Sequence, residues 1–283
     1  MPRSESLDLL ISMALDEDVG SGDVTTLWTV GAEEVGHAVV VAKEPLVVAG
    51  IDAALAVFQR VDPQLELVAE IQDGDRAGVG EVVMRIHGSL RSILTAERVA
   101  LNFLGRLSGI STLTRKFVEA VGGTNATILD TRKTTPGWRL LEKAAVMAGG
   151  GGNHRMGLHD MVLVKDNHLA AAGGVSSALE GVRRGNEAGL PVEVEVSTLD
   201  ELEEVLAQKV DRILLDNMNL ETLGQAVIRT GALGDDRPLL EASGNMTLDR
   251  VRSVAETGVD FISIGALTHS APAADLSLRV LES

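Results

Sequence analysis

The chain has 283 residues, 45% of them hydrophobic, which indicates a folded globular protein with one large α/β domain or two smaller ones. A net charge of −16 and only 2% aromatic residues argue against nucleic acid as a partner, because such binders are basic and stack bases on aromatic rings. There is no Cys, so disulfides and thiolate chemistry are excluded. Five acids in the first twenty positions and the lack of a long uncharged apolar run predict neither a signal peptide nor a membrane span, so we expect a cytoplasmic protein.

The first 120 residues mix helical and extended patterns. Apolar side chains at helical spacing predict helices at 5–18 and 96–120. A turn rich in glycine and small polar residues is expected at 18–26. Segments rich in Val and Ile predict strands at 36–49, where Pro45 interrupts the run, at 66–71 and at 81–87.

From residue 126 onward, strand patterns alternate with helix patterns. The expected strands are 126–130, 161–165, 192–196, 212–216, 238–242 and 260–264. The expected helices are 138–148, 174–188, 199–208, 220–230 and 247–257. Repeated βα units predict a parallel sheet, either closed into a barrel or open and doubly wound.

Charged and polar residues stand at the carboxyl ends of successive expected strands. These residues are Arg132 and Lys133, then Lys165, Glu195, Asp216, Glu241 with Ser243, and finally Gly265. An active site of a (β/α) barrel is built in this way, whereas an open sheet concentrates its site at one switch point. No G-x-G-x-x-G motif lies between a strand and a helix, so the barrel is the favoured interpretation.

The segment 132–165 carries six Lys or Arg against two acids, a local charge of +4 in an acidic protein. The candidate binding residues in it are Arg132, Lys133, His154, Arg155 and Lys165. Such a cluster favours a pocket for a small polyanion. The alternative is a basic face that balances neighbouring acids.

Acidic side chains supply a second kind of candidate residue. Val192–Val196 alternates strictly, so Glu193 and Glu195 share one face and would point into a barrel. Two buried carboxylates repel unless a cation or a hydrogen-bond donor lies between them, which Lys133, Lys165 or Mg²⁺ could supply. The alternative is an edge strand with outward glutamates. Asp216 is a candidate for binding Mg²⁺ or a sugar hydroxyl, or alternatively for capping the next helix.

Two further features leave alternatives open. Lys165 could be a Schiff-base nucleophile or a permanent cation that binds a carboxylate, and the neighbouring cations favour the second role. The last two expected strands lead to Ser243, Gly244, Gly265 and His269. Many barrels bind phosphate at this position, although ordinary loop residues would look similar.

The chain resembles the quinolinate phosphoribosyltransferase family nearly from end to end. The motifs that carry the resemblance include Thr-Ala-Glu-Arg at 95–98, Asp-Thr-Arg-Lys-Thr-Thr-Pro-Gly at 130–137, Asn-His-Arg-Met-Gly-Leu at 153–158, Glu-Val-Glu-Val at 193–196 and Glu-Ala-Ser-Gly at 241–244. The resemblance implies a decarboxylating transfer of phosphoribosyl from 5-phosphoribosyl pyrophosphate to quinolinate, with Mg²⁺ as cofactor. The products are nicotinate mononucleotide, pyrophosphate and carbon dioxide.

The resemblance also implies a role for each candidate residue. Quinolinate would be held by Arg98, Arg132, His154, Arg155 and Lys165. The catalytic residues Lys133, Glu195 and Asp216 would face 5-phosphoribosyl pyrophosphate, with Mg²⁺ on Glu195 and Asp216 directly or through water. The 5-phosphate would lie near Ser243, Gly244, Gly265 and His269.

The family implies an N-terminal α/β sandwich and an incomplete α/β barrel. The expected boundaries are 1–110 for the sandwich, 111–272 for the barrel and 273–283 for a segment returning to the sandwich. We expect a homodimer, or a higher oligomer, whose subunits share each active site. Asn245 stands where many relatives carry glycine, and Trp138 and Met147 also depart from the pattern. Competing interpretations are a molybdenum-transport-associated paralogue, a Schiff-base lyase using Lys165, and a non-catalytic phosphate-ligand sensor.

Overall fold

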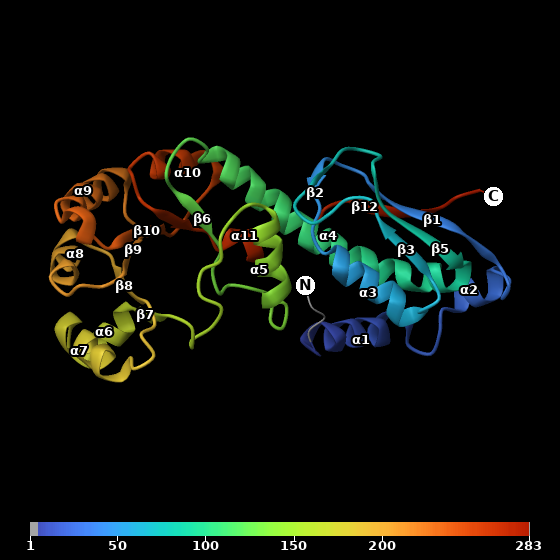
Figure 1. Cartoon of the computed structure of the whole chain (residues 1–283), viewed down its shortest axis with the longest axis horizontal. Helices are drawn as coiled ribbons and strands as arrows, with labels where there is room; N and C mark the ends of the chain where they lie inside the picture. The colour runs from blue at the N-terminus through green and yellow to red at the C-terminus, as the bar shows by residue number, and fades with distance from the viewer. Residues whose placement is uncertain (1–4, 283) are drawn as a thin grey trace. The chain divides into compact units, whose positions relative to one another are not determined.

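The computed structural model describes residues 5–282, which fall into two compact units (Figure 1). The first unit comprises the chain up to Arg115, residues 134–150 and the segment from Ser270 onward. The second comprises 116–133 and 151–269. Each unit is therefore discontinuous in sequence, since 134–150 belongs with the first unit. No helix among the described residues has the length and apolar character needed to cross a membrane.

The first unit contains a four-stranded antiparallel sheet with the order β12-β1-β5-β3. Its strands are Leu276–Val280, Val35–Ala42, Val82–Ser89 and Glu66–Ala69, and a separate pair joins β2 (Leu46–Val47) to β4 (Arg76–Ala77). The helices are α1 (Glu5–Val19), α2 (Val24–Thr29), α3 (Ile51–Val61) and the long α4 (Leu90–Ala120). Buried side chains of β1, β5, α3 and α4 make the core, so the end of the chain completes a sheet that begins near its start.

Several elements of this unit differ from the sequence-based predictions: α4 begins at Leu90, six residues before its expected start, and the strands β4 and β12 were not predicted. Residues 24–26 begin helix α2 instead of forming a turn, because the Asp23 side chain accepts a hydrogen bond from the Thr26 amide at 3.0 Å and caps the helix. Helix α3 has no counterpart among the predicted elements. It contains three alanines, all buried, and its apolar side chains recur at helical spacing.

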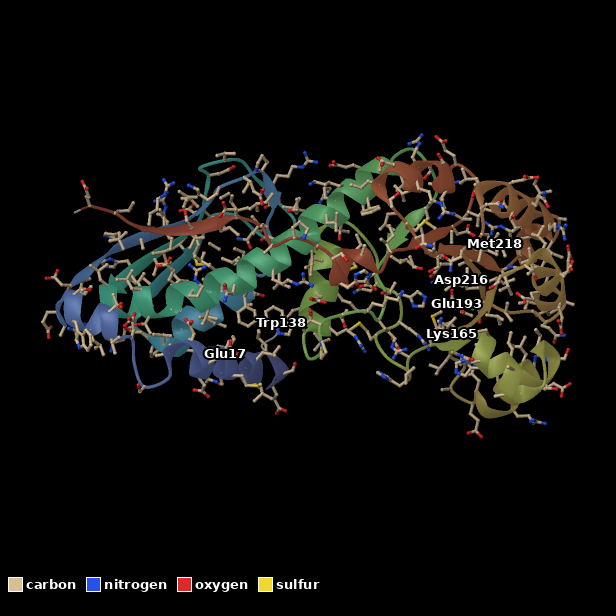
Figure 2. The ribbon with its side chains drawn as sticks, turned by 180° about the vertical axis from the view of Figure 1, so that it is seen from behind. Glu17, Trp138, Lys165, Glu193, Asp216 and Met218 are labelled. Atoms are coloured by element: carbon tan, nitrogen blue, oxygen red, sulfur yellow. The ribbon has the colours of Figure 1, made fainter. Side chains whose placement is uncertain are left out.

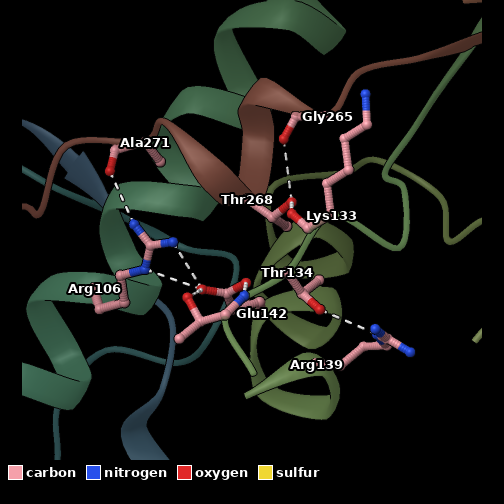
Figure 3. A network of polar contacts seen from close by, with 9 residues as sticks. Arg106, Lys133, Thr134, Arg139, Glu142, Gly265, Thr268 and Ala271 are labelled. Atoms are coloured by element: carbon pink, nitrogen blue, oxygen red, sulfur yellow. Dashed lines mark hydrogen bonds and ion pairs between the residues drawn. The ribbon is translucent and has the colours of Figure 1, made fainter. Parts of the chain in front are cut away.

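Helix α5 (Arg139–Ala148) is anchored within the first unit by an ion pair (Figure 3). The fully buried Glu142 carboxylate accepts hydrogen bonds from Arg106 on α4 at 2.7 and 3.1 Å and from the Thr135 amide at 3.0 Å. Arg106 also donates to the carbonyl of Ala271 at 3.0 Å. These contacts tie the α5 segment and the C-terminal segment to α4.

The second unit is built on six parallel strands in the order β6-β11-β10-β9-β8-β7. The strands are β6 (Thr127–Leu129), β7 (Val162–Val164), β8 (Val192–Val196), β9 (Arg212–Asp216), β10 (Leu239–Ser243) and β11 (Phe261–Ser263). The helices are α6 (Asp166–Ala172), α7 (Val175–Gly185), α8 (Leu199–Leu206), α9 (Leu220–Gly231), α10 (Leu248–Ala255) and α11 (Ala266–His269), with a 3₁₀ turn at Gly234–Asp236. All six predicted strands are present within two residues of their expected ends.

The strand order decides between the barrel and the open sheet. The first strand, β6, pairs with the last, β11, and every other pairing joins strands that are consecutive in sequence. An open doubly wound sheet would reverse its order at a switch point, and this order does not reverse. The described strands leave one gap, between β6 and β7, where only a bridge from Leu129 to Gly152 extends the pairing. The prediction of an incomplete barrel is confirmed.

Candidate active site

The predicted site residues gather at the carboxyl ends of the barrel strands. A cavity of about 380 Å³ is lined by Arg132, Lys133, His154, Arg155, Lys165, Glu195, Asp216 and Ser243, among others. An adjoining cavity of about 540 Å³ shares Lys133, Asp216 and Ser243 and adds Gly244, Gly265 and His269. Of the twelve predicted residues, only Arg98 is not on either cavity. It is an exposed residue of α4 in the first unit.

Local sequence explains why these side chains meet. Lys165 follows β7, Glu195 lies on β8 and Asp216 ends β9, and these three strands are neighbours in the sheet. Parallel neighbours present their carboxyl ends at the same edge, so residues far apart in sequence come together. Figure 2 labels Lys165, Glu193 and Asp216, which come from this group of strands. The Lys165 ammonium group forms an ion pair with the Glu195 carboxylate.

The two alternating glutamates of β8 both point into the barrel. β8 pairs with β7 and β9 and is therefore not an edge strand, and Glu193 is fully buried. Each of the two glutamates has its own partner among the described residues. Glu195 pairs with Lys165 near the cavity, whereas Glu193 pairs with the His154 ring at a Nε2–Oε2 distance of 3.0 Å.

His154 lies on a buried cluster of charged groups. Its Nε2 is 3.0 Å from Glu193 and 3.4 Å from Glu241, and its backbone amide donates to Asp130 at 2.9 Å. Burial alone lowers the pKa of His154, but the hydrogen bonds and charges of the two glutamates outweigh it and raise that pKa to about 9. Nδ1 lies 2.7 Å from the Arg155 amide nitrogen, and Nε2 is the nitrogen that faces the two glutamates.

The two buried glutamates respond differently to this environment. Burial raises the pKa of Glu193, and the nearby Glu241 charge adds to the effect although His154 opposes it. Burial acts on Glu241 as well, but His154, Ser263 and Arg212 together lower the pKa of Glu241. Arg212 donates to Glu241 at 3.0 Å, and its guanidinium lies 4.1 Å from the Phe261 ring centre.

Sequence reasoning assigned no site role to Glu241 or Arg212. Glu241 stands two positions before Ser243 and therefore shares its inward face, and this alternation is the signal that could have found it. Arg212 begins β9, at the end of the strand away from the cavity, so its position gave no such signal.

Two sets of residues could bind a metal ion. Glu195 and Asp216 offer carboxylates on an open cavity, a donor set that suits Mg²⁺, which binds one or two carboxylates and keeps waters or phosphates. His154, Glu193 and Glu241 place ligand atoms within 4.8 Å of one another. That set is buried, whereas Glu195, although paired with Lys165, lies with Asp216 on an open cavity that admits the waters or phosphates that Mg²⁺ keeps. The structure therefore fits Mg²⁺ at Glu195 and Asp216 better.

The loop after β10 shows how the chain tolerates Asn245. Gly244 has φ +97°, and a Cβ there would lie 2.1 Å from Oδ1 of Asn217. Asn245 itself has φ +47°, in the left-handed region that asparagine enters more readily than most residues. Its side chain donates to Asn217 at 3.3 Å. The substitution for glycine is thus compatible with the conformation of this loop.

Of the other two departures from the family pattern, Trp138 stacks on Phe103 with ring centres 4.7 Å apart, and Met147 is exposed.

Comparisons with known proteins cover nearly the whole chain. Residues 23–108 match the family described as "Quinolinate phosphoribosyl transferase, N-terminal domain", and residues 110–279 match its C-terminal domain. "Quinolinate phosphoribosyltransferase [decarboxylating] 1b" of Nicotiana tabacum is 45% identical and covers 99% of this chain and 84% of its own. The "Probable nicotinate-nucleotide pyrophosphorylase [carboxylating]" of a Synechocystis species is 43% identical, covering 97% and 92%.

A solved structure agrees with these relatives. The nicotinate-nucleotide pyrophosphorylase of Francisella tularensis superposes with a TM-score of 0.94 at 37% identity, and the match covers 99% of this chain and 98% of that one. The sequence motifs, the barrel topology and the residues that line the cavity therefore all agree with these relatives. The chain belongs to the quinolinate phosphoribosyltransferase family.

Proposed function

We propose that this enzyme transfers the phosphoribosyl group of 5-phosphoribosyl pyrophosphate to quinolinate with decarboxylation, in the de novo biosynthesis of NAD. The proposal is carried by one observation: in a chain of this family, one barrel mouth brings four Lys or Arg together with three carboxylates. In the reaction the quinolinate nitrogen bonds to C1 of the ribose as the bond from C1 to pyrophosphate breaks. The 2-carboxylate leaves as carbon dioxide, and a proton replaces it on the ring.

Arg132, His154, Arg155 and Lys165 would bind the two carboxylates of quinolinate. A dianion gains most from several charge-assisted hydrogen bonds made at once, and all four side chains line the same cavity. Both His154 ring nitrogens already contact protein groups, Glu193 on one side and the Arg155 amide on the other. We therefore propose that His154 contributes its charge at the wall of the pocket, while the arginines supply the bidentate contacts.

Glu195 and Asp216 would face the ribose of 5-phosphoribosyl pyrophosphate. Departure of pyrophosphate leaves positive charge on the ribose, which carboxylates fixed at the strand ends stabilise directly or through the hydroxyls. Lys133 lines both cavities and would balance the charge of pyrophosphate or of the decarboxylating ring. Ser243, Gly244, Gly265 and His269 line the second cavity, where the 5-phosphate would bind.

Three finer points belong to this proposal. Mg²⁺ would be held by Glu195 and Asp216, directly or through water, and would balance the charge of the pyrophosphate group. The enzyme would be a homodimer in which Arg98 enters the neighbour's site. It would act in the cytoplasm, since both substrates are polyanions that do not cross a membrane unaided.

A Schiff-base lyase is the rival chemistry at this cavity. It would need the free amine of Lys165, but the ion pair with Glu195 is made by the ammonium form, which is not nucleophilic. Borohydride trapping with a carbonyl substrate should therefore leave no adduct on Lys165.

The reaction is tested by incubating the protein with quinolinate labelled in its 2-carboxylate, 5-phosphoribosyl pyrophosphate and Mg²⁺. We expect labelled carbon dioxide and nicotinate mononucleotide in equal amounts. Nicotinate has one carboxylate and should be a poor substitute, because half of the cationic contacts would be unused. If nicotinate turns over as well as quinolinate, the assignment of these cations to two carboxylates is wrong.

A further inference from the structure

Lys133 is an exposed side chain whose position is defined by few contacts. Within residues 5–282 its ammonium group makes no ion pair or hydrogen bond. A lysine has a flexible four-carbon stem and loses rotamer entropy when it is fixed. A lysine that must meet a substrate therefore gains from any contact that fixes its backbone or stem beforehand.

One such contact comes from Thr268, a fully buried residue of the short helix α11 (Figure 3). Its hydroxyl donates to the Lys133 carbonyl at 2.8 Å and lies 3.2 Å from the Gly265 carbonyl. Gly265 is three residues earlier, so it is the acceptor that a helical threonine normally finds within its own turn. The hydroxyl has one proton, and the shorter contact leads to Lys133, 135 positions away in sequence.

A second contact comes from Gly265, which follows β11. A Cβ at this position would lie 3.1 Å from Cδ of Lys133 and 3.2 Å from Nε2 of His269. The stem of Lys133 therefore passes directly over the glycine backbone. The two strands involved are neighbours: β11 pairs with β6, and the Ile264 amide continues that pairing to Leu129. The loops that follow them are thus held side by side.

We infer that Thr268 is a positioning residue for Lys133, acting from the loop of the last barrel strand on the loop of the first. The Thr268 hydroxyl fixes the Lys133 backbone, and the absence of a side chain at Gly265 leaves the path for the lysine stem. The ammonium group is thereby held where the two cavities adjoin, since Lys133 lines both. The identity of the ligand, 5-phosphoribosyl pyrophosphate, rests on the proposed function. The link between Thr268 and Lys133 rests only on the contacts described above.

The first test needs no ligand. Thr268→Val keeps the shape of the side chain and removes the donor, whereas Thr268→Ser keeps the donor. Hydrogen exchange of the backbone amides in 131–135, measured by mass spectrometry, should become about threefold to tenfold faster in Thr268→Val, as expected for one lost hydrogen bond. Thr268→Ser should restore slow exchange. Unchanged exchange in Thr268→Val would overturn the inference, whatever reaction the enzyme catalyses.

The second test asks whether Thr268 acts through Lys133. The dissociation constant for 5-phosphoribosyl pyrophosphate is measured by calorimetry in wild type, Thr268→Val, Lys133→Ala and the double variant, well below their melting temperatures. We expect Thr268→Val to weaken binding about threefold to tenfold in the wild-type background and not at all beside Lys133→Ala. Equal weakening in both backgrounds would show a general structural role and overturn the inference.

A matched control separates this effect from the loss of any buried hydroxyl. Thr230 of α9 is also fully buried, and its hydroxyl has no hydrogen-bond partner among the described residues. Thr230→Val should change neither the exchange of 131–135 nor ligand binding. Failure of the wild type to bind 5-phosphoribosyl pyrophosphate would instead contradict the proposed function, and the exchange measurement would still decide the role of Thr268.

Discussion

The cavity is lined by cationic side chains and by carboxylates, and we expect the two kinds to act on different substrates. Arg155→Ala removes one charge-assisted contact, worth roughly 1.5–3 kcal/mol, so quinolinate should bind about tenfold more weakly or worse. Glu195→Ala should mainly reduce turnover and the use of 5-phosphoribosyl pyrophosphate. Titration calorimetry with each ligand measures both effects.

Arg184→Ala is a matched control for the loss of one positive charge. Arg184 is an exposed residue in the last turn of α7 and does not line either cavity. Its removal should leave quinolinate binding unchanged. Equal loss of quinolinate binding in Arg155→Ala and Glu195→Ala, with the sugar ligand unaffected, would contradict the division of roles.

His154 should make stability depend on pH through its contacts with Glu193 and Glu241. Its pKa of about 9 in the folded protein lies above the unfolded value of about 6.5. Its contribution to the free energy of unfolding is therefore fully present below about pH 6.5 and is lost as the pH rises through about 9. The stability difference between wild type and His154→Gln, measured by urea unfolding, should be larger at pH 6 than at pH 9.5. A difference that is constant or grows with pH would show that the ring is neutral.

At the scale of secondary structure, two helical glycines should respond in opposite ways to alanine. A Cβ at the buried Gly109 of α4 would lie 1.9 Å from the Pro272 carbonyl oxygen, so Gly109→Ala should force the C-terminal segment away and cost about 1–3 kcal/mol. At Gly224 of α9 nothing lies within 4 Å of the added carbon. Gly224→Ala should therefore stabilise the protein by about 0.5–1 kcal/mol, the usual gain within a helix.

Urea unfolding of the two variants checks this pair. The midpoint should fall for Gly109→Ala and rise for Gly224→Ala, with similar slopes because neither change alters the surface exposed on unfolding by much. A stabilised Gly109→Ala variant would mean that the contact between α4 and the C-terminal segment is loose.

At the scale of the whole molecule, the proposed dimer predicts complementation between inactive variants. Arg98 belongs to the first unit and Lys133 to the cavity of the second. Arg98→Ala and Lys133→Ala should each be nearly inactive. If Arg98 serves the neighbour's site, a mixed dimer has one site with both defects and one with neither. Unfolding and refolding the two variants together should then restore part of the activity.

Simple mixing of the folded variants is the control for subunit exchange. It should restore no activity while the parent dimers stay intact. Heterodimers that form, as shown by mass spectrometry of the native protein, and yet remain inactive would mean that Arg98 serves its own chain's site or none.

The sequence by itself determined the alternation of strands and helices in the barrel and most of the residues on its cavity. A buried strand shows in the sequence as a short apolar run. Alternation along that run shows which polar side chains face inward, so strands and their inward residues can both be recognised locally. Glu195 and Asp216 could be found in this way because each stands at or near the carboxyl end of such a run. Helix α3 was missed, although its apolar side chains recur at helical spacing and its inner face is buried.

Only the tertiary structure decided which charges meet. The strand order places β6 beside β11 and so brings Thr268 to the Lys133 carbonyl. It also places Glu241 next to His154 and Arg212 next to Glu241, two contacts that the sequence did not predict. Such partnerships depend on which strands become neighbours and on the depth of each side chain in the barrel. Periodicity gives the face of a strand on which a side chain lies, but it does not give the partner across the barrel.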